Sequence, residues 1–474
     1  MFRGRTDELK QLKDCVQSPH ANLVVLKGRR RIGKSSLIEH FADQEKLRFI
    51  KIEGLAPAKG QTDLHQLDYF AKQLSRQTDW TYLKLSDWTD AFTALDSQIS
   101  KNQKTLVLLD EISWLGKHNN NFSGYLKSAW DNLLKKNNGL TLVLCGSVST
   151  WIEENIMSHT AFVGRIHLAL HLKELPLKIC SQFWRNSTIS TFEKYKFLCL
   201  TGGIPRYLEE LRPKETAEQN IHRLVFQKSG LLYHEFDDLF NESYNLDNKS
   251  YRSILLALLE GPKSFIQICK DLNVEKNGVI SKYLENLSLA GFITRDYLIK
   301  SDGNPSKLSR YRLSDNYTRF YLKYILNQKN KIEKNLIHNI NFESMPHWQT
   351  ILGLQFQNLL NNNYDAILRE LQIDPHIVTF IGPYFQNKTT KTKNGVEIDL
   401  LIQTKHHTHY ICEFKFRKKI DPNVLKEIQD KVTFYARPKY ISVRPVLIYE
   451  GELSEKLLEL QDHLQIVSAA KFLD

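Results

Sequence analysis

The octapeptide GRRRIGKS, residues 28–35, has the residue types that hold the phosphates of a nucleotide. Gly28 and Gly33 let the backbone turn its N–H groups towards phosphate oxygens, and the ammonium group of Lys34 can reach the β- and γ-phosphates. The Ser35 hydroxyl is an oxygen ligand suited to Mg²⁺. The octapeptide stands between an apolar run, NLVVL, and a helical pattern, SSLIEHFA. We therefore predict a P-loop that binds ATP and Mg²⁺. The loop is completed by Arg29, Arg30, Arg31, Ile32 and Ser36.

Two adjacent acids, Asp110 and Glu111, follow the apolar run KTLVLL. An acid at the end of such a strand can support Mg²⁺, and the next acid can polarise a water molecule for attack on the γ-phosphate. We predict these roles for Asp110 and Glu111 respectively. The alternative is that both side chains cap the helix that follows.

Three further polar residues are candidates for contact with the γ-phosphate. Ser147 follows the apolar run LTLVLC, where a small polar side chain could sense that phosphate. Arg165, in a Gly-Arg pair, and Arg206, in TGGIPRYL, could each stabilise the developing negative charge as an arginine finger or sensor. Alternatively, either arginine is an ordinary surface residue.

A second group of chemical residues lies near the carboxyl end of the chain. Asp399 ends the alternating run VEID, and thirteen residues separate it from Glu413, which is followed by Lys415 at i+2. Residues i and i+2 of a strand share a face, and a hairpin can bring Asp399 beside them. Two carboxylates and a lysine can hold Mg²⁺ and orient water for attack on a phosphodiester. This spacing is the D…ExK pattern of restriction-endonuclease-like nucleases.

The elements that position these residues indicate a multidomain α/β protein. Continuous apolar runs alternate with helical patterns over residues 1–170, which predicts a parallel sheet covered on both faces. Residues 171–245 read as a helical lid. Residues 246–330 contain three helices and a two-stranded wing, the pattern of a winged helix-turn-helix. Residues 331–474 mix helices and strands as a second α/β domain.

The motifs in this order resemble the archaeal-type ATPase family, a P-loop group of the AAA+/STAND assemblage. FRGRTDELKQL, GRRRIGKSSL, LLDEISWL, LCGS, the Gly-Arg pair and TGGIPRYL carry the resemblance over the first 245 residues. It implies that Gly4 and Arg5 lie near the adenine, and that Gly203 and Pro205 belong to a lid over the nucleotide. In such ATPases the winged helix often packs on its own protein instead of reading DNA.

The last part of the chain, from about Gly353, is similar to the nuclease-superfamily domain that commonly follows this ATPase type. Such domains usually carry a glutamate in a GxxFE pattern, whereas this chain reads GLQFQ and has Gln357 there. An amide cannot supply a negative charge. Metal binding by Asp399 and Glu413 can survive this change. Two alternatives stay open for the domain: an active nuclease, and a DNA-binding remnant that does not cleave. The upstream acid Glu397 could compensate for Gln357, although strand alternation is expected to put it on the same face as Asp399 and no nearer the expected metal.

The net charge of +12 fits a polyanionic partner such as DNA, although it also serves solubility. No run of 18 or more apolar residues is present, so we expect no membrane span and a cytoplasmic protein, which could form a homo-oligomer. The leading hypothesis is an ATP-hydrolysing switch that acts on DNA. The alternatives are a non-catalytic nucleotide-bound module and a DNA loader.

Overall fold

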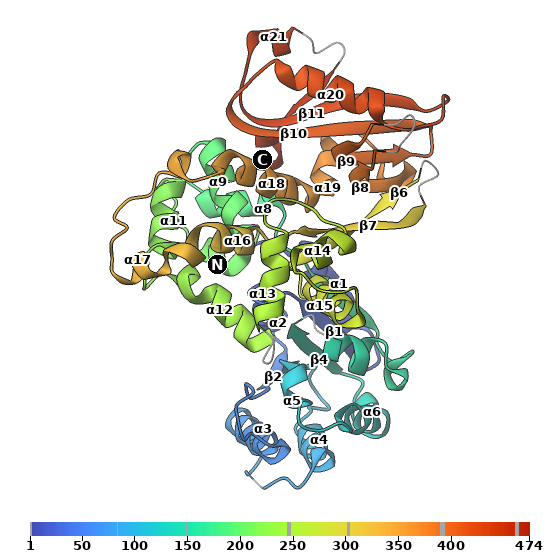
Figure 1. Ribbon diagram of the computed structural model, residues 1–474. Coiled ribbons are helices and arrows are strands. Elements are labelled where there is room, and N and C mark those ends of the chain that lie inside the picture. The colour runs from blue at the N-terminus through green and yellow to red at the C-terminus, as the bar shows by residue number, and fades with distance from the viewer. Residues whose placement is uncertain are drawn as a thin grey trace. The chain divides into compact units, whose positions relative to one another are not determined.

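The computed structural model describes residues 2–82, 84–147, 150–243, 248–300, 304–388, 394–459 and 464–474. The chain divides into two compact units, Met1–Lys173 and Glu174–Asp474. Each unit contains one five-stranded sheet, and the second also contains a two-stranded hairpin (Figure 1). Among the described residues, no helix has the length and apolar character needed to cross a membrane.

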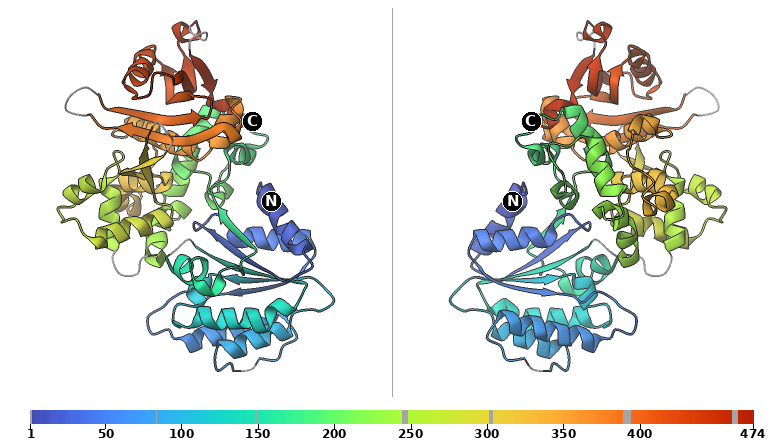
Figure 2. Two further views of the ribbon diagram at one scale, coloured as in Figure 1. Left: turned by 90° about the vertical axis from the view of Figure 1, so that its right-hand side faces the viewer. Right: turned by 90° about the vertical axis from the view of Figure 1, so that its left-hand side faces the viewer.

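The sheet of the first unit is entirely parallel and has the strand order β2-β3-β4-β1-β5 (Figure 2). Its strands are β1 (Asn22–Gly28), β2 (Arg48–Glu53), β3 (Thr105–Asp110), β4 (Leu140–Ser147) and β5 (Leu168–Leu172). The apolar runs that predicted β1, β3 and β4 are buried over nearly their whole length, as expected of strands covered on both faces. In a parallel sheet the strands end at one edge, so the carboxyl ends of β1, β3 and β4 come together.

Helices cover both faces of this sheet. They are α1 (Thr6–Gln17), α2 (Lys34–Gln44), α3 (Asp63–Gln77), α4 (Trp88–Ser97), α5 (Ile112–Leu115), α6 (Phe122–Asn132) and α7 (Thr150–Ile152). The core between the sheet and α3, α4 and α6 is rich in aromatic rings: Trp88 meets Phe70 and Phe122 edge to face, with centroids 5.9 and 4.7 Å apart. This packing makes the sheet a rigid support for the loops at its carboxyl edge.

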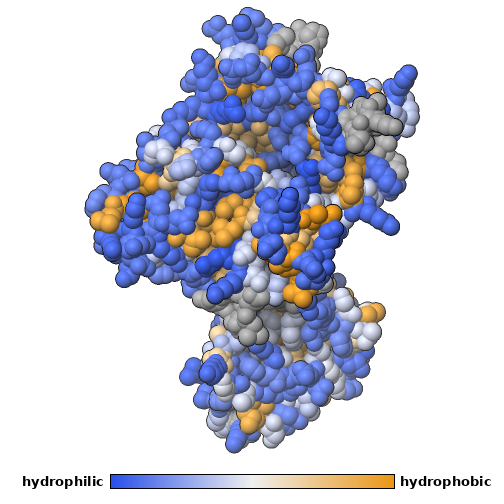
Figure 3. Space-filling view, in the orientation of Figure 1, coloured by the Kyte–Doolittle hydropathy of each residue, from blue (hydrophilic) through white to orange (hydrophobic). Residues whose placement is uncertain are grey.

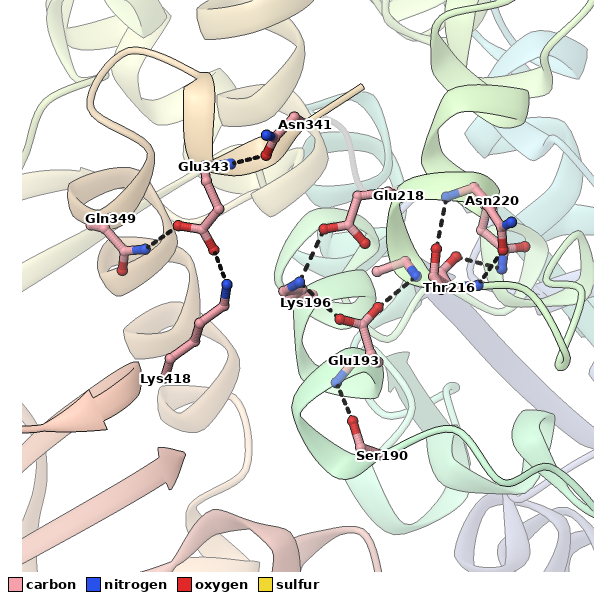
Figure 4. A network of polar contacts seen from close by, with 12 residues as sticks. Ser190, Glu193, Lys196, Thr216, Glu218, Asn220, Asn341, Glu343, Gln349 and Lys418 are labelled. Carbon is pink, nitrogen blue, oxygen red and sulfur yellow. Dashed lines mark hydrogen bonds and ion pairs between the residues drawn. The ribbon is translucent and has the colours of Figure 1, made fainter. Parts of the chain in front are cut away.

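The second unit begins with the helices predicted as a lid. They are α8 (Leu177–Ser181), α9 (Thr191–Thr201), α10 (Pro205–Glu209), α11 (Ala217–Val225) and α12 (Leu231–Ser243). Lys196 of α9 is buried and forms ion pairs with Glu193 and with Glu218 of α11, at 2.8 and 3.0 Å (Figure 4). These ion pairs tie α9 to α11.

Three helices and a hairpin follow, in the order expected of a winged helix-turn-helix. They are α13 (Asn248–Ala257), α14 (Phe265–Asp271), α15 (Gly278–Leu289), and the antiparallel strands β6 (Ile293–Ile299) and β7 (Pro305–Leu313). The short helices α16 (Asn316–Phe320) and α17 (Lys329–Glu333) come next. The winged-helix assignment itself remains a prediction.

The last sheet has the order β12-β11-β10-β9-β8. Its elements are α18 (Trp348–Asn361), α19 (Tyr364–Glu370), β8 (Val378–Gln386), β9 (Val396–Thr404), β10 (Thr408–Ile420), α20 (Asn423–Phe434), β11 (Ser442–Leu453), α21 (Glu455–Leu458) and β12 (Gln465–Ser468). Strands β8, β9 and β10 pair antiparallel, whereas β10, β11 and β12 pair parallel. Asp399 lies in the middle of β9 and not at the end of a strand, because the apolar pattern continues to Thr404.

The lid helices share a core with this last sheet. The Tyr195 hydroxyl of α9 donates a hydrogen bond to the Ala469 carbonyl at 2.6 Å, and its ring lies 5.4 Å from that of Phe356 in α18. The Phe416 ring of β10 also contacts Phe192 and Phe356, with centroids 4.7 and 5.1 Å away. The segment predicted as a lid is therefore built into the same body as the carboxy-terminal sheet.

Candidate functional site

The predicted phosphate loop lies between β1 and α2. Gly28 is the last residue of β1, and Gly33, with φ of 87°, immediately precedes α2. A Cβ at position 28 would lie 2.8 Å from the Leu172 carbonyl oxygen and 3.1 Å from Cγ2 of Ile32, so a side chain cannot be accommodated without a backbone shift. Gly33 and Arg31 both have positive φ, which only glycine adopts without strain. The loop conformation thus accounts for both glycines of the motif.

The side chain of Lys34 is folded under this loop. Lys34 is 7% exposed, and its Nζ donates hydrogen bonds to the carbonyl oxygens of Gly28 at 3.1 Å and Arg29 at 3.3 Å. The ammonium group and the first N–H groups of α2 therefore lie at the same loop. A helix amino terminus with an adjacent cation is a favourable place for phosphate.

Ser35 and Asp110 meet at the carboxyl edge of the sheet. The Ser35 hydroxyl donates a hydrogen bond to Oδ2 of Asp110 at 2.5 Å, and Asp110 is 3% exposed. The Lys51 ammonium lies 3.6 Å from the same carboxylate oxygen. A hydroxyl and a carboxylate side by side are hard oxygen donors of the type that Mg²⁺ prefers, so these two residues fit that ion.

Glu111 adopts an unusual backbone conformation next to Asp110. Its φ of 48° is in the left-handed region, which costs a residue with a side chain about 1 kcal/mol or more. Its carboxylate makes no capping hydrogen bond to α5, so helix capping does not explain this residue. Burial raises the pKa of its carboxyl group, a rise that Lys34 opposes and Asp110 reinforces. A half-buried carboxylate with a raised pKa is suited to accepting a proton from water.

The three carboxy-terminal candidates converge. The Phe414 backbone N–H donates to Oδ2 of Asp399 at 2.8 Å, which places β9 and β10 in the predicted hairpin. Lys415 forms an ion pair with Oε1 of Glu413 at 2.8 Å. Gln357 of α18 also reaches this site, where its amide donates to Oδ1 of Asp399 at 3.2 Å. Glu397 is exposed and pairs with Arg310 of β7, away from these residues.

The structure adds one residue that the sequence pattern did not reveal. Lys431 of α20 forms an ion pair with Oε2 of Glu413. Burial disfavours the ionised form of Glu413, but Lys431 and Lys415 outweigh this effect and lower its pKa. Burial and the neighbouring charge of Glu413 raise the pKa of Asp399 to about 6. Lys431 lies on a separate helix, so no strand periodicity connects it with the ExK pattern.

Comparison with known proteins decides the identity of the first part of the chain. Residues 2–211 match the family described as an ATPase domain predominantly from Archaea. These residues are an ATPase domain of that family. The match crosses the boundary between the two compact units after Lys173.

The chain is also similar to a solved structure and to two other proteins, each over a different length. A Walker-type ATPase of Pyrococcus abyssi matches with a TM-score of 0.50 and 19% identity, covering 68% of this chain and 96% of that chain, which supports the fold alone. An uncharacterized protein of Methanocaldococcus jannaschii is 26% identical over 463 residues, 96% of either chain. An uncharacterized ATP-binding protein of the same organism is 42% identical over 48 residues, which are 10% of this chain and 81% of that protein.

Arg165 of the ATPase domain lies at the opposite edge of the sheet from its own P-loop. It precedes β5, and nearby His167 accepts a hydrogen bond from the Leu23 backbone N–H at 3.1 Å, near the start of β1. Gly28 is five residues further along β1, or about 16 Å away in a strand. The Arg165 guanidinium instead forms two hydrogen bonds to the Asp131 carboxylate, at 2.9 and 2.8 Å. A contact between Arg165 and a γ-phosphate on its own P-loop is thus incompatible with this placement.

Arg5 of the ATPase domain contacts the P-loop directly. It is 8% exposed, and its guanidinium donates to the carbonyl oxygens of Ile32 at 3.2 Å and Lys173 at 2.7 Å. Gly4 and Arg5 both have positive φ, which turns the chain into α1. The structure therefore gives Arg5 a positioning role on the loop, and its predicted contact with adenine remains a prediction.

Ser147 and the TGGIPRYL motif also have clear structural positions. Ser147 pairs with Gly28 in the register of β4 and β1, so it lies beside the P-loop. In the second unit, a Cβ on Gly203 would lie 2.4 Å from the Leu175 carbonyl oxygen, and Pro205 is the first residue of α10. Arg206 forms an ion pair with Glu210 at 2.8 Å. Close packing thus accounts for Gly203, and the roles predicted for Pro205 and Arg206 at the nucleotide remain predictions.

Proposed function

We propose that this protein binds and hydrolyses ATP with Mg²⁺ and uses the cycle as a switch on DNA. The observation that carries the proposal is the direct contact between Ser35 and the buried Asp110 carboxylate, with Glu111 as the next residue. When bound between Ser35 and Asp110, Mg²⁺ would neutralise phosphate charge. Lys34 and the amino terminus of α2 would hold the β- and γ-phosphates.

In this proposal Glu111 accepts a proton from the attacking water. Its strained backbone fixes the carboxylate at the strand end, and its raised pKa favours proton uptake. The proton passes from the water oxygen to a Glu111 oxygen as the water attacks the γ-phosphorus and the bond to the bridging oxygen breaks. Glu111→Gln should retain ATP binding and lower turnover at least about 100-fold, in line with the usual contribution of a general base.

Glu53→Gln is the matched control for this experiment. Glu53 ends the neighbouring strand, pairs with Asp110 in the register of β2 and β3, and is exposed. The same chemical change there should leave turnover within about twofold, because a solvated surface carboxylate contributes little. Steady-state phosphate release and nucleotide affinity are measured for both variants. If Glu111→Gln hydrolyses ATP as fast as the parent protein, Glu111 has no role in the reaction.

The position of Arg165 favours action on a second copy of the chain. Asp131 holds its guanidinium with two hydrogen bonds, beside a surface pocket lined also by His20 and Ala21. An arginine held at the edge remote from its own P-loop could approach the nucleotide of a neighbouring subunit. Mixing Arg165→Ala with Lys34→Ala tests this idea. The Lys34→Ala subunit keeps its arginine, and the Arg165→Ala subunit keeps an intact P-loop, so a mixed assembly contains one complete site. Recovery of turnover in the mixture supports action in trans, whereas strict absence of recovery contradicts it.

The DNA part of the proposal rests on the net charge of the chain and not on α15, the helix that would enter a DNA groove in a winged helix-turn-helix. The exposed side chains at the start of α15 and the preceding turn include Val274 and Val279, and Ile266 of α14 is 59% exposed. Figure 3 shows apolar surface over these helices. DNA-reading helices usually present basic side chains, and Lys276 and Lys282 are exposed here beside the apolar residues, so this face suits either DNA or a protein surface. The net charge of +12 still predicts DNA affinity that falls as salt rises, and affinity independent of salt would contradict it.

A further inference from the structure

The nuclease-like site of the second unit has its carboxylate oxygens already engaged by hydrogen-bond donors. On Asp399, Oδ1 accepts from the Gln357 amide at 3.2 Å and Oδ2 accepts from the Phe414 N–H at 2.8 Å. On Glu413, Oε1 is paired with Lys415 at 2.8 Å and Oε2 with Lys431. All four carboxylate oxygens of the two predicted metal ligands therefore face protein N–H groups.

These donors are of the wrong kind for a metal centre. Mg²⁺ and Mn²⁺ need oxygen atoms whose lone pairs point at the ion, in near-octahedral arrangement for Mg²⁺. The Gln357 amide presents hydrogens where a glutamate would present a third carboxylate. No group of three or more His, Cys, Asp or Glu side chains that could hold a metal exists among the residues that the structure describes. The residues at this site thus do not fit a catalytic divalent cation.

Lys431 supplies the positive charge that such a cation would supply. Glu413 is 4% exposed, and a carboxylate buried to this degree needs a counter-charge. The ExK lysine, Lys415, is shared with Glu427, which it meets at 2.5 Å. The Lys431 side chain is 20% exposed and reaches Glu413 from α20, a helix that packs on β10. The Lys431 ammonium therefore adds to Lys415 in neutralising Glu413, and it also fastens α20 to the sheet.

We infer that the Lys431 ammonium occupies the cation position of this nuclease-like site, so that the domain takes up no catalytic Mg²⁺ and does not cleave DNA by metal-assisted hydrolysis. Gln357 and Lys431 act together: the first removes a negative charge, and the second adds a fixed positive charge. The inference concerns the second unit alone and is independent of ATP hydrolysis by the first.

Manganese binding to the full-length, nucleotide-free protein tests the inference. Free Mn²⁺ is counted by electron paramagnetic resonance during titration of the parent protein, Asp399→Asn, and the double variant Gln357→Glu/Lys431→Met. The parent and Asp399→Asn should bind the same number of ions. The double variant should bind one more ion per chain, and adding Asp399→Asn to it should abolish the gain.

A matched control separates the position of Lys431 from loss of a lysine in general. Lys426 is an exposed residue of the same helix, so Gln357→Glu/Lys426→Met has the same formal charge as the double variant but retains the ion pair at Glu413. It should gain no ion. Circular dichroism and thermal unfolding establish that each variant is folded.

Two metal-binding results would overturn the inference. One is an Mn²⁺ ion bound by the parent protein and lost in Asp399→Asn, which would mean that Lys431 yields to the metal. This comparison requires no change at Lys431 and stays decisive even if that variant fails to fold. The other is a folded double variant that binds no additional ion. Plasmid nicking by the parent with Mn²⁺ that is absent in Asp399→Asn would likewise contradict the inference. ATP turnover is measured in the same variants, and unchanged turnover would show that failure of this inference leaves the ATPase proposal intact.

Discussion

Replacing Arg5 should loosen the P-loop, because its guanidinium holds the Ile32 carbonyl of that loop. The Arg5 guanidinium donates to the carbonyl oxygens of Ile32 and Lys173, and the side chain is buried. A hydrogen bond to a charged group contributes about 1.5–3 kcal/mol to stability. Its ion pair with Glu8 at 3.2 Å is partly solvated and adds at most about 1 kcal/mol. The two hydrogen bonds together set the lower bound, so we expect Arg5→Ala to destabilise the first unit by at least about 3 kcal/mol.

The backbone conformation of Arg5 allows a second, matched substitution. With φ of 64°, Arg5 and its alanine replacement both bear the left-handed strain of about 1 kcal/mol, which glycine avoids. Arg5→Gly loses the same hydrogen bonds as Arg5→Ala but should be about 1 kcal/mol more stable. The difference between the two variants therefore isolates the backbone cost from the side-chain contacts.

Thermal unfolding and nucleotide titration provide the measurements. For a unit of this size, about 3 kcal/mol corresponds to a decrease of about 6–12 °C in the midpoint of its transition. ATP affinity should also fall, because the Ile32 carbonyl is part of the loop that Lys34 lies under. An Arg5→Ala protein that unfolds within about 2 °C of the parent and binds ATP equally well would refute the assigned role.

Three further predictions concern other parts of the chain. Gly28→Ala should weaken ATP binding at least about tenfold in a fluorescent-nucleotide titration, because the new Cβ would contact the Leu172 carbonyl oxygen. The control Gly124→Ala, whose new Cβ would have no atom within 4 Å, should bind ATP like the parent, and equal affinities of the two variants would contradict the prediction. Burial lowers the pKa of His409 from 6.5 to about 4, so between these pH values the unfolded chain binds more protons than the folded chain, and the stability of the folded protein should fall as pH drops from 6.5 to 4. The same pH dependence of stability in His409→Gln would contradict this prediction. Phe416→Ala should lower the free energy of unfolding by about 3–5 kcal/mol and expose α9 and the last sheet to limited proteolysis together. Cleavage of the sheet with α9 still protected would contradict the shared core.

Much of the nucleotide site could be predicted because its motifs are local in sequence. Residues 28–35 specify a loop and its flanking strand and helix within one short segment, and the continuous apolar runs before Asp110 and Ser147 identified β3 and β4. The strands β2, RFIKIE, and β5, LALHL, are shorter and interrupted by polar residues. Their patterns are therefore ambiguous without the neighbouring strands that bury them.

The remaining features depend on contacts between distant residues. Lys431 follows Glu413 by eighteen positions and lies on a helix, so only the packing of α20 on β10 brings the two together. Arg165 stands in a motif with the residue types of a sensor, but the edge of the sheet to which it belongs depends on the register of β5 with β1. Periodicity along the sequence carries no information on either point.

The core shared by α9 and the last sheet has a consequence for how this protein can be divided and recombined. The family match ends at residue 211, whereas the compact unit to which α9 belongs begins at Glu174 and continues to the end of the chain. A fragment that ends at residue 211 would leave Tyr195 without Phe356 and without the Ala469 carbonyl. Exchange of whole modules between relatives should therefore succeed at residue 173 and fail at residue 211. In the same way, any displacement of α9 must move the last sheet with it as one rigid body.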